Sequence, residues 1–476
     1  MQQALEAISD RPPDEVIRRL GELETQHGGR RRYPWQKLGL SPLATALEPL
    51  AQLCRLCQNS PGAPTPEAFA ESYAREGWRT DAAALATMAA CGAQEQHGVV
   101  LDVLRAVYLP WLENSARHLQ QLICDNGHTV AKRSTPVEPK PGRVVLFADG
   151  LRLDVAQQLA QQLKSVGLAS TQEWEWSTIP SVTATAKPAA SPVAGAVQGG
   201  DAGAEFATSL ISSGQRLTQD RFIAALVERG WQCLSSDETG DAAGSAWTES
   251  GTLDKRGHNE GWKLARAVQS EVRDVTSRIA AWVQAGWSEV VVVTDHGWLL
   301  MPGGLPKVEL KSFLAENQWG RCAALKPASQ TDLPTFKWHW NPGVTIACPP
   351  GVGCFRASME YSHGGVSLQE MVTPRLRVTA ARAAGDSARL LEVKWTGARC
   401  RLSVGGECAG VRADIRSRRA DPATSVLADR QARELAPDGK ATVFLESDAD
   451  IGQQAEVVLL DATGTVIDSQ PTKLGE

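Results

Sequence analysis

Two short runs of β-branched and aliphatic residues, each followed within two residues by an aspartate, constrain the fold of this chain most. The runs are 144–147 and 290–293, and they lead into Asp149 and Asp295. Short apolar strands alternating with amphipathic helices are typical of a mostly parallel sheet that helices cover on both faces. Ligands bind such sheets beyond the carboxyl ends of the strands. The pattern therefore predicts an α/β fold with both aspartates at one edge of the sheet.

Two segments between these strands have the apolar spacing of amphipathic helices. Apolar residues recur at helical spacing from Leu153 to Leu163 and again from Leu264 to Val283. We expect both helices to cover the sheet. Residues 188–250 are rich in Ala, Gly and Ser and interrupt the alternation. This stretch is expected to form loops, with a mobile cover over the site as one hypothesis.

The patterning divides the chain into three expected domains. Residues 1–140 are expected to form a helical domain, which ends in a proline-rich linker at 134–142. Residues 141–382 hold the alternating strands and helices. Residues 383–476 alternate at period two, which predicts a small antiparallel, β-sandwich-like domain with a hairpin turn at 461–464.

Composition indicates a globular protein that would have to recognise any polyanion through a local site. The chain has 476 residues, 42% of them hydrophobic, and a formal net charge of -5, so nothing in its overall charge attracts nucleic acid or an anionic membrane. No apolar run approaches the ~18 residues of a spanning helix, and the N-terminus lacks the pattern of a signal peptide. The ten cysteines are scattered, as in a protein with reduced thiols. We therefore expect a cytoplasmic location and no membrane partner.

Six carboxylate and imidazole residues have a spacing that suits two adjacent divalent metal ions. Each has a simpler interpretation taken alone: a helix cap, a surface polar pair or a loop histidine. Their occurrence in one domain, with two of them at the predicted sheet edge, favours metal-assisted phosphate-ester chemistry. The six residues are Asp149, Asp254, His258, Asp295, His296 and His363.

The order of these residues, with Thr183 between the first and the second, resembles the alkaline phosphatase superfamily. Four segments resemble its PglZ branch, which is known from bacterial phage-defence systems of the BREX type. A helical stretch between residues 73 and 111 is loosely similar, so that the resemblance covers roughly residues 70 to 380. The four segments are 147–154, 179–183, 294–298 and 361–365.

The resemblance implies a threonine or serine nucleophile between two metal ions, usually zinc, with manganese or magnesium as alternatives. One ion would be held by Asp254, His258 and His363. The other would be held by Asp149, Asp295 and His296. The oxygen of Thr183 would face both ions. Thr183 is preferred to Ser181 and Thr185 because it lies three residues after a proline, as in related phosphodiesterases.

The implied function is a phosphomonoesterase or phosphodiesterase of an anti-phage defence system. Its substrate would be a phosphate ester, with nucleotides and nucleic acids among the candidates, and it would have protein partners in a defence complex. Arg152 is the best candidate to bind the charged phosphoryl group, ahead of Lys187 and Lys307. Two alternatives stay open. One is an assembly component whose metal site is idle or structural, and the other is a metal-dependent phosphomutase.

Overall fold

The chain forms two compact units, Met1–Ala380 and Ala381–Glu476. The computed structural model describes all residues except 35–41, 60–61, 92–96, 131–135, 201–204, 236, 381–387, 407, 437, 462–463 and 476. The expected domain boundary at 382/383 therefore lies outside the described residues, as do the first two positions of the expected linker. The expected helical domain and the α/β domain lie in the same compact unit.

A six-stranded sheet in the order β2-β13-β7-β1-β6-β5 forms the centre of the first unit. Strands β5, β6, β1 and β7 are parallel to one another, whereas β13 pairs antiparallel with both β7 and β2. The expected mainly parallel sheet is thus confirmed, with one antiparallel strand that the apolar pattern did not indicate. The bounds are β1 Arg143–Phe147, β2 Leu168–Trp176, β5 Trp231–Leu234, β6 Ser245–Glu249, β7 Glu289–Val293 and β13 Val372–Ala380.

Helices cover both faces of this sheet, as the alternating side chains of β1 show. Val144 and Leu146 pack in one hydrophobic cluster with α8 (Leu153–Ser165) and α12 (Val268–Gln284). Val145 and Phe147 point the other way, into a cluster with α10 (Gln219–Glu228). Successive strand residues face opposite sides of a sheet, so a strand that is apolar throughout requires a helix layer on each side.

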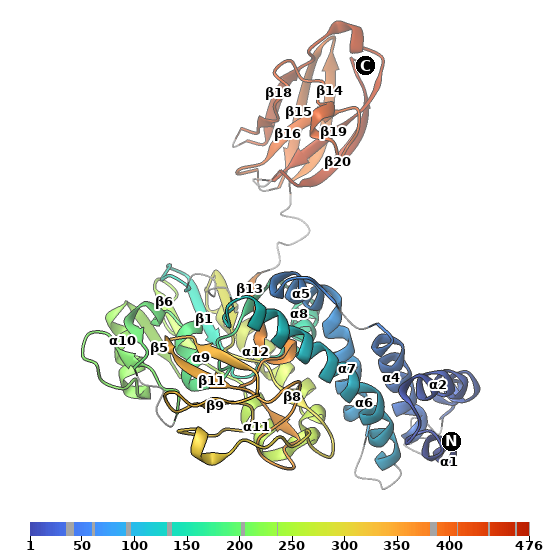
Figure 1. Ribbon diagram of the computed structural model, residues 1–476. Coiled ribbons are helices and arrows are strands. Elements are labelled where there is room, and N and C mark those ends of the chain that lie inside the picture. The colour runs from blue at the N-terminus through green and yellow to red at the C-terminus, as the bar shows by residue number, and fades with distance from the viewer. Residues whose placement is uncertain are drawn as a thin grey trace. The chain divides into compact units, whose positions relative to one another are not determined.

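The N-terminal helices share the first of these two clusters with the sheet. Figure 1 shows them gathered beside the sheet in blue and teal. Among the described residues, no helix is both long and apolar enough to cross a membrane. The bounds are α1 Gln2–Glu6, α2 Pro13–His27, α4 Pro42–Cys57, α5 Pro66–Ser72, α6 Trp78–Ala90 and α7 Gly98–Asp125, with a 3-10 turn at Gly28–Arg32 and a π-helical turn at Tyr73–Gly77.

The expectation of loops over 188–250 is wrong for much of that stretch. Helix α10 and the sheet strands β5 and β6 all lie within it. The strands were missed because β5 is short and half-buried and β6 begins with small or polar residues, so neither has a long aliphatic run.

The shorter elements of the unit are α9 Thr183–Ala190, α11 Leu253–Glu260, α13 Leu368–Met371, β3 Val197–Gln198, β4 Ser209–Leu210, β8 Leu299–Leu300, β9 Ala323–Ala324, β10 Thr335–Trp338, β11 Asn341–Ala347 and β12 Tyr361–Ser362, with 3-10 turns at Ala194–Ala196, Gly261–Arg266 and Ser312–Leu314.

The second unit is all β in its described residues apart from short 3-10 turns, as the period-two alternation predicts. It holds a three-stranded sheet, β14-β15-β18, and a four-stranded sheet, β17-β16-β19-β20, around a cluster of its own. Two positions of the expected hairpin turn at 461–464 lie outside the described residues. The bounds are β14 Arg389–Thr396, β15 Arg399–Gly405, β16 Arg412–Arg416, β17 Arg433–Glu434, β18 Lys440–Phe444, β19 Gln454–Leu460 and β20 Val466–Lys473, with 3-10 turns at Pro422–Thr424 and Asp448–Asp450.

Separate cores predict separate unfolding transitions for the two units. Ile415 is fully buried in the cluster of the second unit, and Ile279 is fully buried in the first. We expect Ile415→Ala to destabilise the second unit by about 3 kcal/mol through lost burial and a residual cavity. The matched substitution Ile279→Ala should act on the first unit alone. Calorimetry of the full chain checks this, and a shift of both transitions in either variant contradicts it.

Candidate metal centre

Asp149 and Asp295 meet at the carboxyl end of the sheet because β1 and β7 are parallel neighbours in register, with Phe147 opposite Val293. Asp295 is fully buried. His296 lies between the two carboxylates. Its Nε2 atom is 3.6 Å from Asp149 Oδ1 and 3.5 Å from Asp295 Oδ2. The ligand-type atoms of these three residues all lie within 4.8 Å of one another, close enough to share one ion.

A second group of three residues lies beside the first. Helix α11 places Asp254 and His258 one turn apart, with His258 Nε2 at 3.6 Å from Asp254 Oδ1. His363, which follows β12, has its Nε2 atom 3.4 Å from the same oxygen and 3.2 Å from His258 Nε2. The two groups are contiguous, because the rings of His296 and His363 stack at 3.7 Å. Asp254, His296 and His363 also form a close group, so His296 lies within reach of either position.

The residues present fit a pair of divalent cations. Asp149 Oδ1 and Asp295 Oδ2 are buried and have no hydrogen-bond partner among the described residues. Buried carboxylate oxygens without a partner are costly, and a cation between them would remove that cost. Two such oxygens beside one imidazole nitrogen are therefore a suitable set of ligand atoms for a metal ion.

The histidines are oriented as metal ligands commonly are. The Nδ1 atoms of His296 and His363 each lie 3.0 Å from a backbone carbonyl, of Gly297 and Ser181 respectively. A carbonyl only accepts, so these contacts place the proton on Nδ1 and leave Nε2 as the free lone pair. On the carboxylate side, the Tyr361 hydroxyl donates to Asp254 Oδ1 at 2.9 Å.

The crowding of charges perturbs the ionisation of the whole cluster. Burial, and then the neighbouring Asp295 carboxylate, raise the pKa of Asp149 to about 8. Burial and the adjacent His296 ring lower the pKa of His363 to about 4. Burial alone would lower the pKa of His296, but the three surrounding carboxylates outweigh it and raise that pKa. For Asp254, the three imidazoles outweigh burial and lower its pKa. Such opposed shifts in one cluster are typical of functional sites.

Of the three candidate hydroxyls, only Thr183 contacts the cluster. Thr183 is the first residue of α9, and its Oγ1 atom lies 3.2 Å from His296 Nε2. The Ser181 hydroxyl instead donates to the Gly365 carbonyl at 3.0 Å. The Thr185 hydroxyl donates to the Phe206 carbonyl at 2.9 Å. The open alternatives for the nucleophile are therefore occupied in structural hydrogen bonds.

The contacts of Arg152 favour a supporting role, and the predicted phosphoryl contact stays a prediction. Its guanidinium is buried, forms a bidentate ion pair with Asp154 at 2.6 and 2.8 Å, and stacks 3.7 Å from the Trp298 ring. Lys187 is paired with Glu249 at 2.7 Å, and Lys307 forms an exposed pair with Glu309. Lys187 is still near enough to Asp149 to favour its ionised form.

Gly297 lies where another segment of the chain leaves no room for a side chain. A Cβ atom there would lie 2.0 Å from the Gln369 carbonyl oxygen and 3.1 Å from Arg152 Cγ. The residue is small because the backbone of another segment packs directly against it. This requirement comes from tertiary packing and has no signal in local sequence.

A buried acid in the N-terminal helices also escaped sequence reasoning. Asp81 accepts hydrogen bonds from Tyr108, from Tyr73 at 2.6 Å and from Gln369 at 3.2 Å. Burial raises its pKa to about 6, against the opposing charge of Arg152. The only sequence signal is an acidic residue on an otherwise apolar stretch of helix α6.

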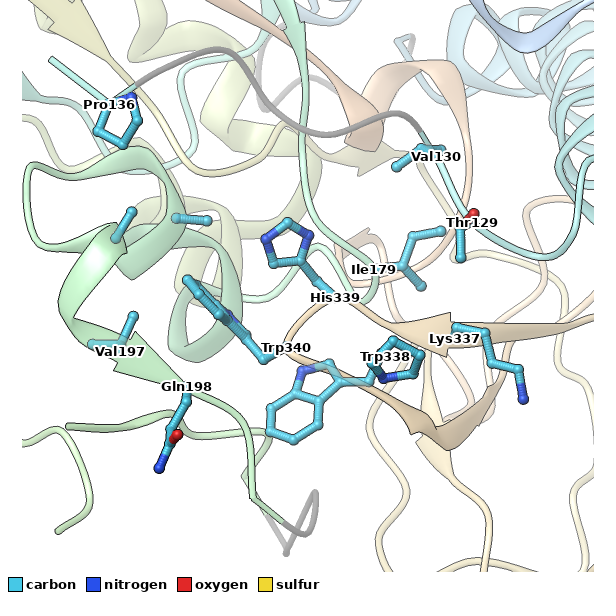
Figure 2. Close-up of a pocket in the computed structure, with 13 residues that line it drawn as sticks. Thr129, Val130, Pro136, Ile179, Val197, Gln198, Lys337, Trp338, His339 and Trp340 are labelled. Carbon is cyan, nitrogen blue, oxygen red and sulfur yellow. The ribbon is translucent and has the colours of Figure 1, made fainter. Parts of the chain in front are cut away.

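The turn between β10 and β11 anchors helix α9 and borders a cavity of about 570 Å³ (Figure 2). The indole nitrogens of Trp338 and Trp340 donate to the hydroxyl and the carbonyl of Thr185 at 3.2 and 2.9 Å. The backbone nitrogen of His339 donates to the Ile179 carbonyl at 2.9 Å. Both ends of the 179–185 segment, which includes Thr183, are therefore fixed by this turn.

The raised pKa of Asp149 predicts a pH-dependent stability in the metal-free protein. A carboxyl whose folded pKa is raised stabilises the fold at low pH, and this contribution is lost as the pH rises through the folded pKa of about 8. Between about pH 7.5 and 8.5 ordinary histidines are nearly neutral. In that window we expect the urea midpoint of the wild type to fall, and that of Asp149→Asn to fall less. Equal slopes would contradict the raised pKa.

Comparison with known proteins gives matches among solved structures at low identity. No match was found among curated proteins. Among solved structures, murine ectonucleotide pyrophosphatase/phosphodiesterase 5 has 9% identity and a TM-score of 0.31, covering 50% of this chain and 87% of that one. The human protein gives the same values. An inactive variant of the murine protein in complex with AMP has a TM-score of 0.33, covering 51% and 88% at 9% identity.

The sequence matches the alkaline phosphatase-like domain of BREX system PglZ over residues 133–378, which is more than half of the chain. This range contains all six residues of the cluster together with Thr183. The chain therefore belongs to the PglZ family of alkaline phosphatase-like proteins.

Proposed function

We propose that this protein is a metal-dependent phosphohydrolase in which Thr183 is the nucleophile. The observation that carries the proposal is the pair of buried, unpartnered carboxylate oxygens on Asp149 and Asp295, next to the Thr183 hydroxyl and three imidazoles. An alkaline phosphatase-like domain supports phosphoester chemistry as the reaction class.

The proposed ligands divide into two groups of three. Asp149, Asp295 and His296 would hold one ion. Asp254, His258 and His363 would hold the other, and Thr183 would face both. His296 is close to both groups, and His258 is the most exposed of the histidines at 43% of its side chain. Mixed imidazole and carboxylate ligands favour zinc, with manganese and magnesium as alternatives.

In the proposed reaction the Thr183 oxygen attacks phosphorus and displaces the ester oxygen, giving a phosphothreonine that water then hydrolyses. Bound divalent ions would supply the Lewis acidity that favours a threonine alkoxide and stabilises the leaving oxygen. The chain supplies the positioning: Thr183 begins α9, whose N-terminus carries free backbone N–H groups and a favourable dipole for phosphoryl oxygens. The Thr183 hydroxyl lies 3.2 Å from Nε2 of His296, one of the proposed ligands, which places it next to the cluster.

The proposed biological setting is a bacterial anti-phage defence system. Membership of the PglZ family, whose description names the BREX system, supports it. In that setting the protein would act on a phosphate ester, including nucleotides and nucleic acids as candidate substrates, and would have protein partners in a defence complex.

An assembly role or a phosphomutase reaction would use the same fold, and the activity measurement below separates them from hydrolysis.

Substitution of Thr183 tests the nucleophile. We expect Thr183→Ala to lower turnover of p-nitrophenyl phosphate or bis-p-nitrophenyl phosphate by at least about 1,000-fold, because the other two candidate nucleophiles, Ser181 and Thr185, donate their hydroxyls to backbone carbonyls instead. Thr183→Ser should retain measurable activity because it keeps an oxygen at the same position. Both variants should bind metal as the wild type does, which separates lost chemistry from a lost site.

Two results would count against this proposal. Full activity in Thr183→Ala would leave the metal centre in place but exclude this nucleophile. A wild type that binds metal yet turns over neither ester with zinc, manganese or magnesium added would favour the assembly role. Phosphate transfer within a substrate without release of inorganic phosphate would favour the mutase.

A further inference from the structure

A fully buried ion pair lies outside the set of proposed metal ligands. Arg321 and Glu370 both have 0% side-chain exposure and form a bidentate pair, with contacts of 3.1 and 2.8 Å. The remaining guanidinium N–H groups of Arg321 donate to the backbone carbonyls of Gly351 and Gly353. No described contact of this pair reaches Thr183 or a carboxylate of the cluster, so its function is not direct chemistry.

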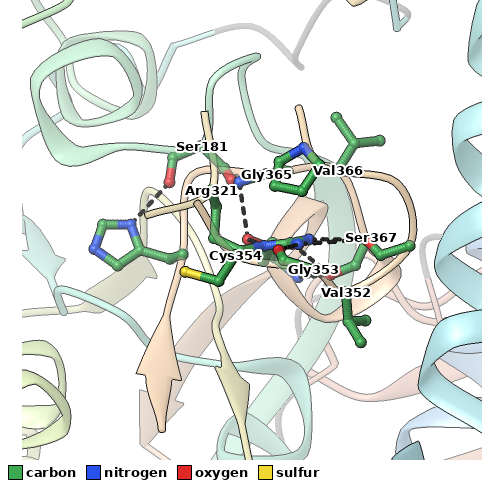
Figure 3. Close-up of polar contacts among 12 residues, drawn as sticks. Ser181, Arg321, Val352, Gly353, Cys354, Gly365, Val366 and Ser367 are labelled. Carbon is green, nitrogen blue, oxygen red and sulfur yellow. Dashed lines mark hydrogen bonds and ion pairs between the residues drawn. The ribbon is translucent and has the colours of Figure 1, made fainter. Parts of the chain in front are cut away.

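Glu370 organises the loop that carries His363. Its Oε1 atom accepts from the Gly365 backbone nitrogen at 2.8 Å, and its Oε2 atom accepts from the Ser367 hydroxyl at 2.7 Å. The Gly365 carbonyl in turn accepts from the Ser181 hydroxyl, and the Ser181 carbonyl orients the His363 ring. Figure 3 shows Ser181, Gly365 and Ser367 gathered around Arg321. The carboxylate is therefore linked through Gly365 and Ser181 to His363.

The backbone of Glu370 organises the other histidine loop. Its carbonyl accepts from the Gly297 nitrogen at 3.1 Å, and the Gly297 carbonyl lies 3.0 Å from His296 Nδ1. Glu370 therefore hydrogen-bonds to both histidine loops, through its carboxylate and its carbonyl. Carbonyl groups linked to these contacts fix the tautomer and the orientation of the His296 and His363 rings. The stacking of those two rings at 3.7 Å leaves little freedom for either loop to move alone.

Arg321 also packs against the backbone of the loop that carries His363. A Cβ atom at Gly365 would lie 2.7 Å from the guanidinium of Arg321, so the loop backbone packs directly on the ion pair. Close packing of this kind transmits small displacements, because protein interiors are dense and have few voids. A shift of the pair would therefore move Gly365 and the residues hydrogen-bonded to it.

We propose that Glu370, held by Arg321, is the positioning residue that aims the imidazoles of His296 and His363 at the bound metal ions. The inference rests on the proposed function, since it assigns a task within the same site. Residues that orient metal ligands through a second hydrogen bond commonly change metal affinity or activity by about 10- to 100-fold when replaced. We expect an effect of that size here.

The experiment compares Glu370 with an ion pair in the central sheet that lies away from the cluster. Arg143 and Glu289 form a pair at 2.6 Å where β1 and β7 begin, at the opposite end of the strands from Asp149 and Asp295. Glu289→Gln is thus a matched control for Glu370→Gln. A third variant combines Arg321→Met with Glu370→Leu, because apolar replacement of a whole buried pair is often tolerated in folding.

Zinc affinity of the metal-stripped proteins is measured by competition with a chromophoric chelator, alongside the melting temperature and kcat on bis-p-nitrophenyl phosphate. The expected result is about 10- to 100-fold weaker zinc binding in whichever Glu370 variants fold, the double variant included, with unchanged affinity in Glu289→Gln. Wild-type zinc affinity in a folded Glu370 variant would overturn the proposal, as would an equal loss in Glu289→Gln. Failure of the proposed function is seen separately in the wild type, which would then bind no zinc or would bind zinc without hydrolysing either ester.

Discussion

Two carboxylates that share one end of the sheet are the constraint on which the rest of this structure depends. Strands β1 and β7 are parallel neighbours in register, so the segments that follow them must emerge side by side and bring Asp149 and Asp295 together. Each keeps a buried oxygen without a hydrogen-bond partner among the described residues. Like charges held this close destabilise a fold unless a proton or a cation compensates them. The raised pKa of Asp149 reflects this conflict, and a divalent ion would resolve it.

The surrounding elements limit what can compensate those charges. Histidines come from the end of β7, from α11 and from the loop after β12, and two of them are fixed by backbone carbonyls. Trp298 joins the two strand ends, since its indole nitrogen donates to the Gly150 carbonyl at 2.8 Å while its ring stacks on Arg152. Arg152 lies close enough to Asp81 to favour its ionised form, so the N-terminal helices and the site loops form one polar network. These polar contacts thus connect the cluster to residues well beyond the proposed metal ligands.

Local sequence was sufficient for the parts of the site that follow from strand ends and helix spacing. A strand-end aspartate and an i, i+4 pair such as Asp254 and His258 have positions set by the element that carries them. Glu370, Arg321 and Gly297 have roles set by contacts between segments far apart in the chain, and one sequence gives no periodicity that marks them. Arg152 forms an ion pair with the buried Asp154 two residues away, and its predicted contact with a phosphoryl group stays a prediction. The antiparallel strand β13 was missed for a related reason, because Pro374 and Arg375 interrupt its apolar pattern.

Anomalous diffraction from crystals soaked in zinc is the decisive experiment, because it locates ions independently of any assay. We expect two neighbouring peaks in each chain. One would lie among Asp149, Asp295 and His296, and the other among Asp254, His258 and His363, with the Thr183 hydroxyl facing both. Peaks confined to surface histidines, or no peak beside Asp149 and Asp295, would show that these residues are not metal ligands, and the two unpaired carboxylate oxygens would then need another explanation.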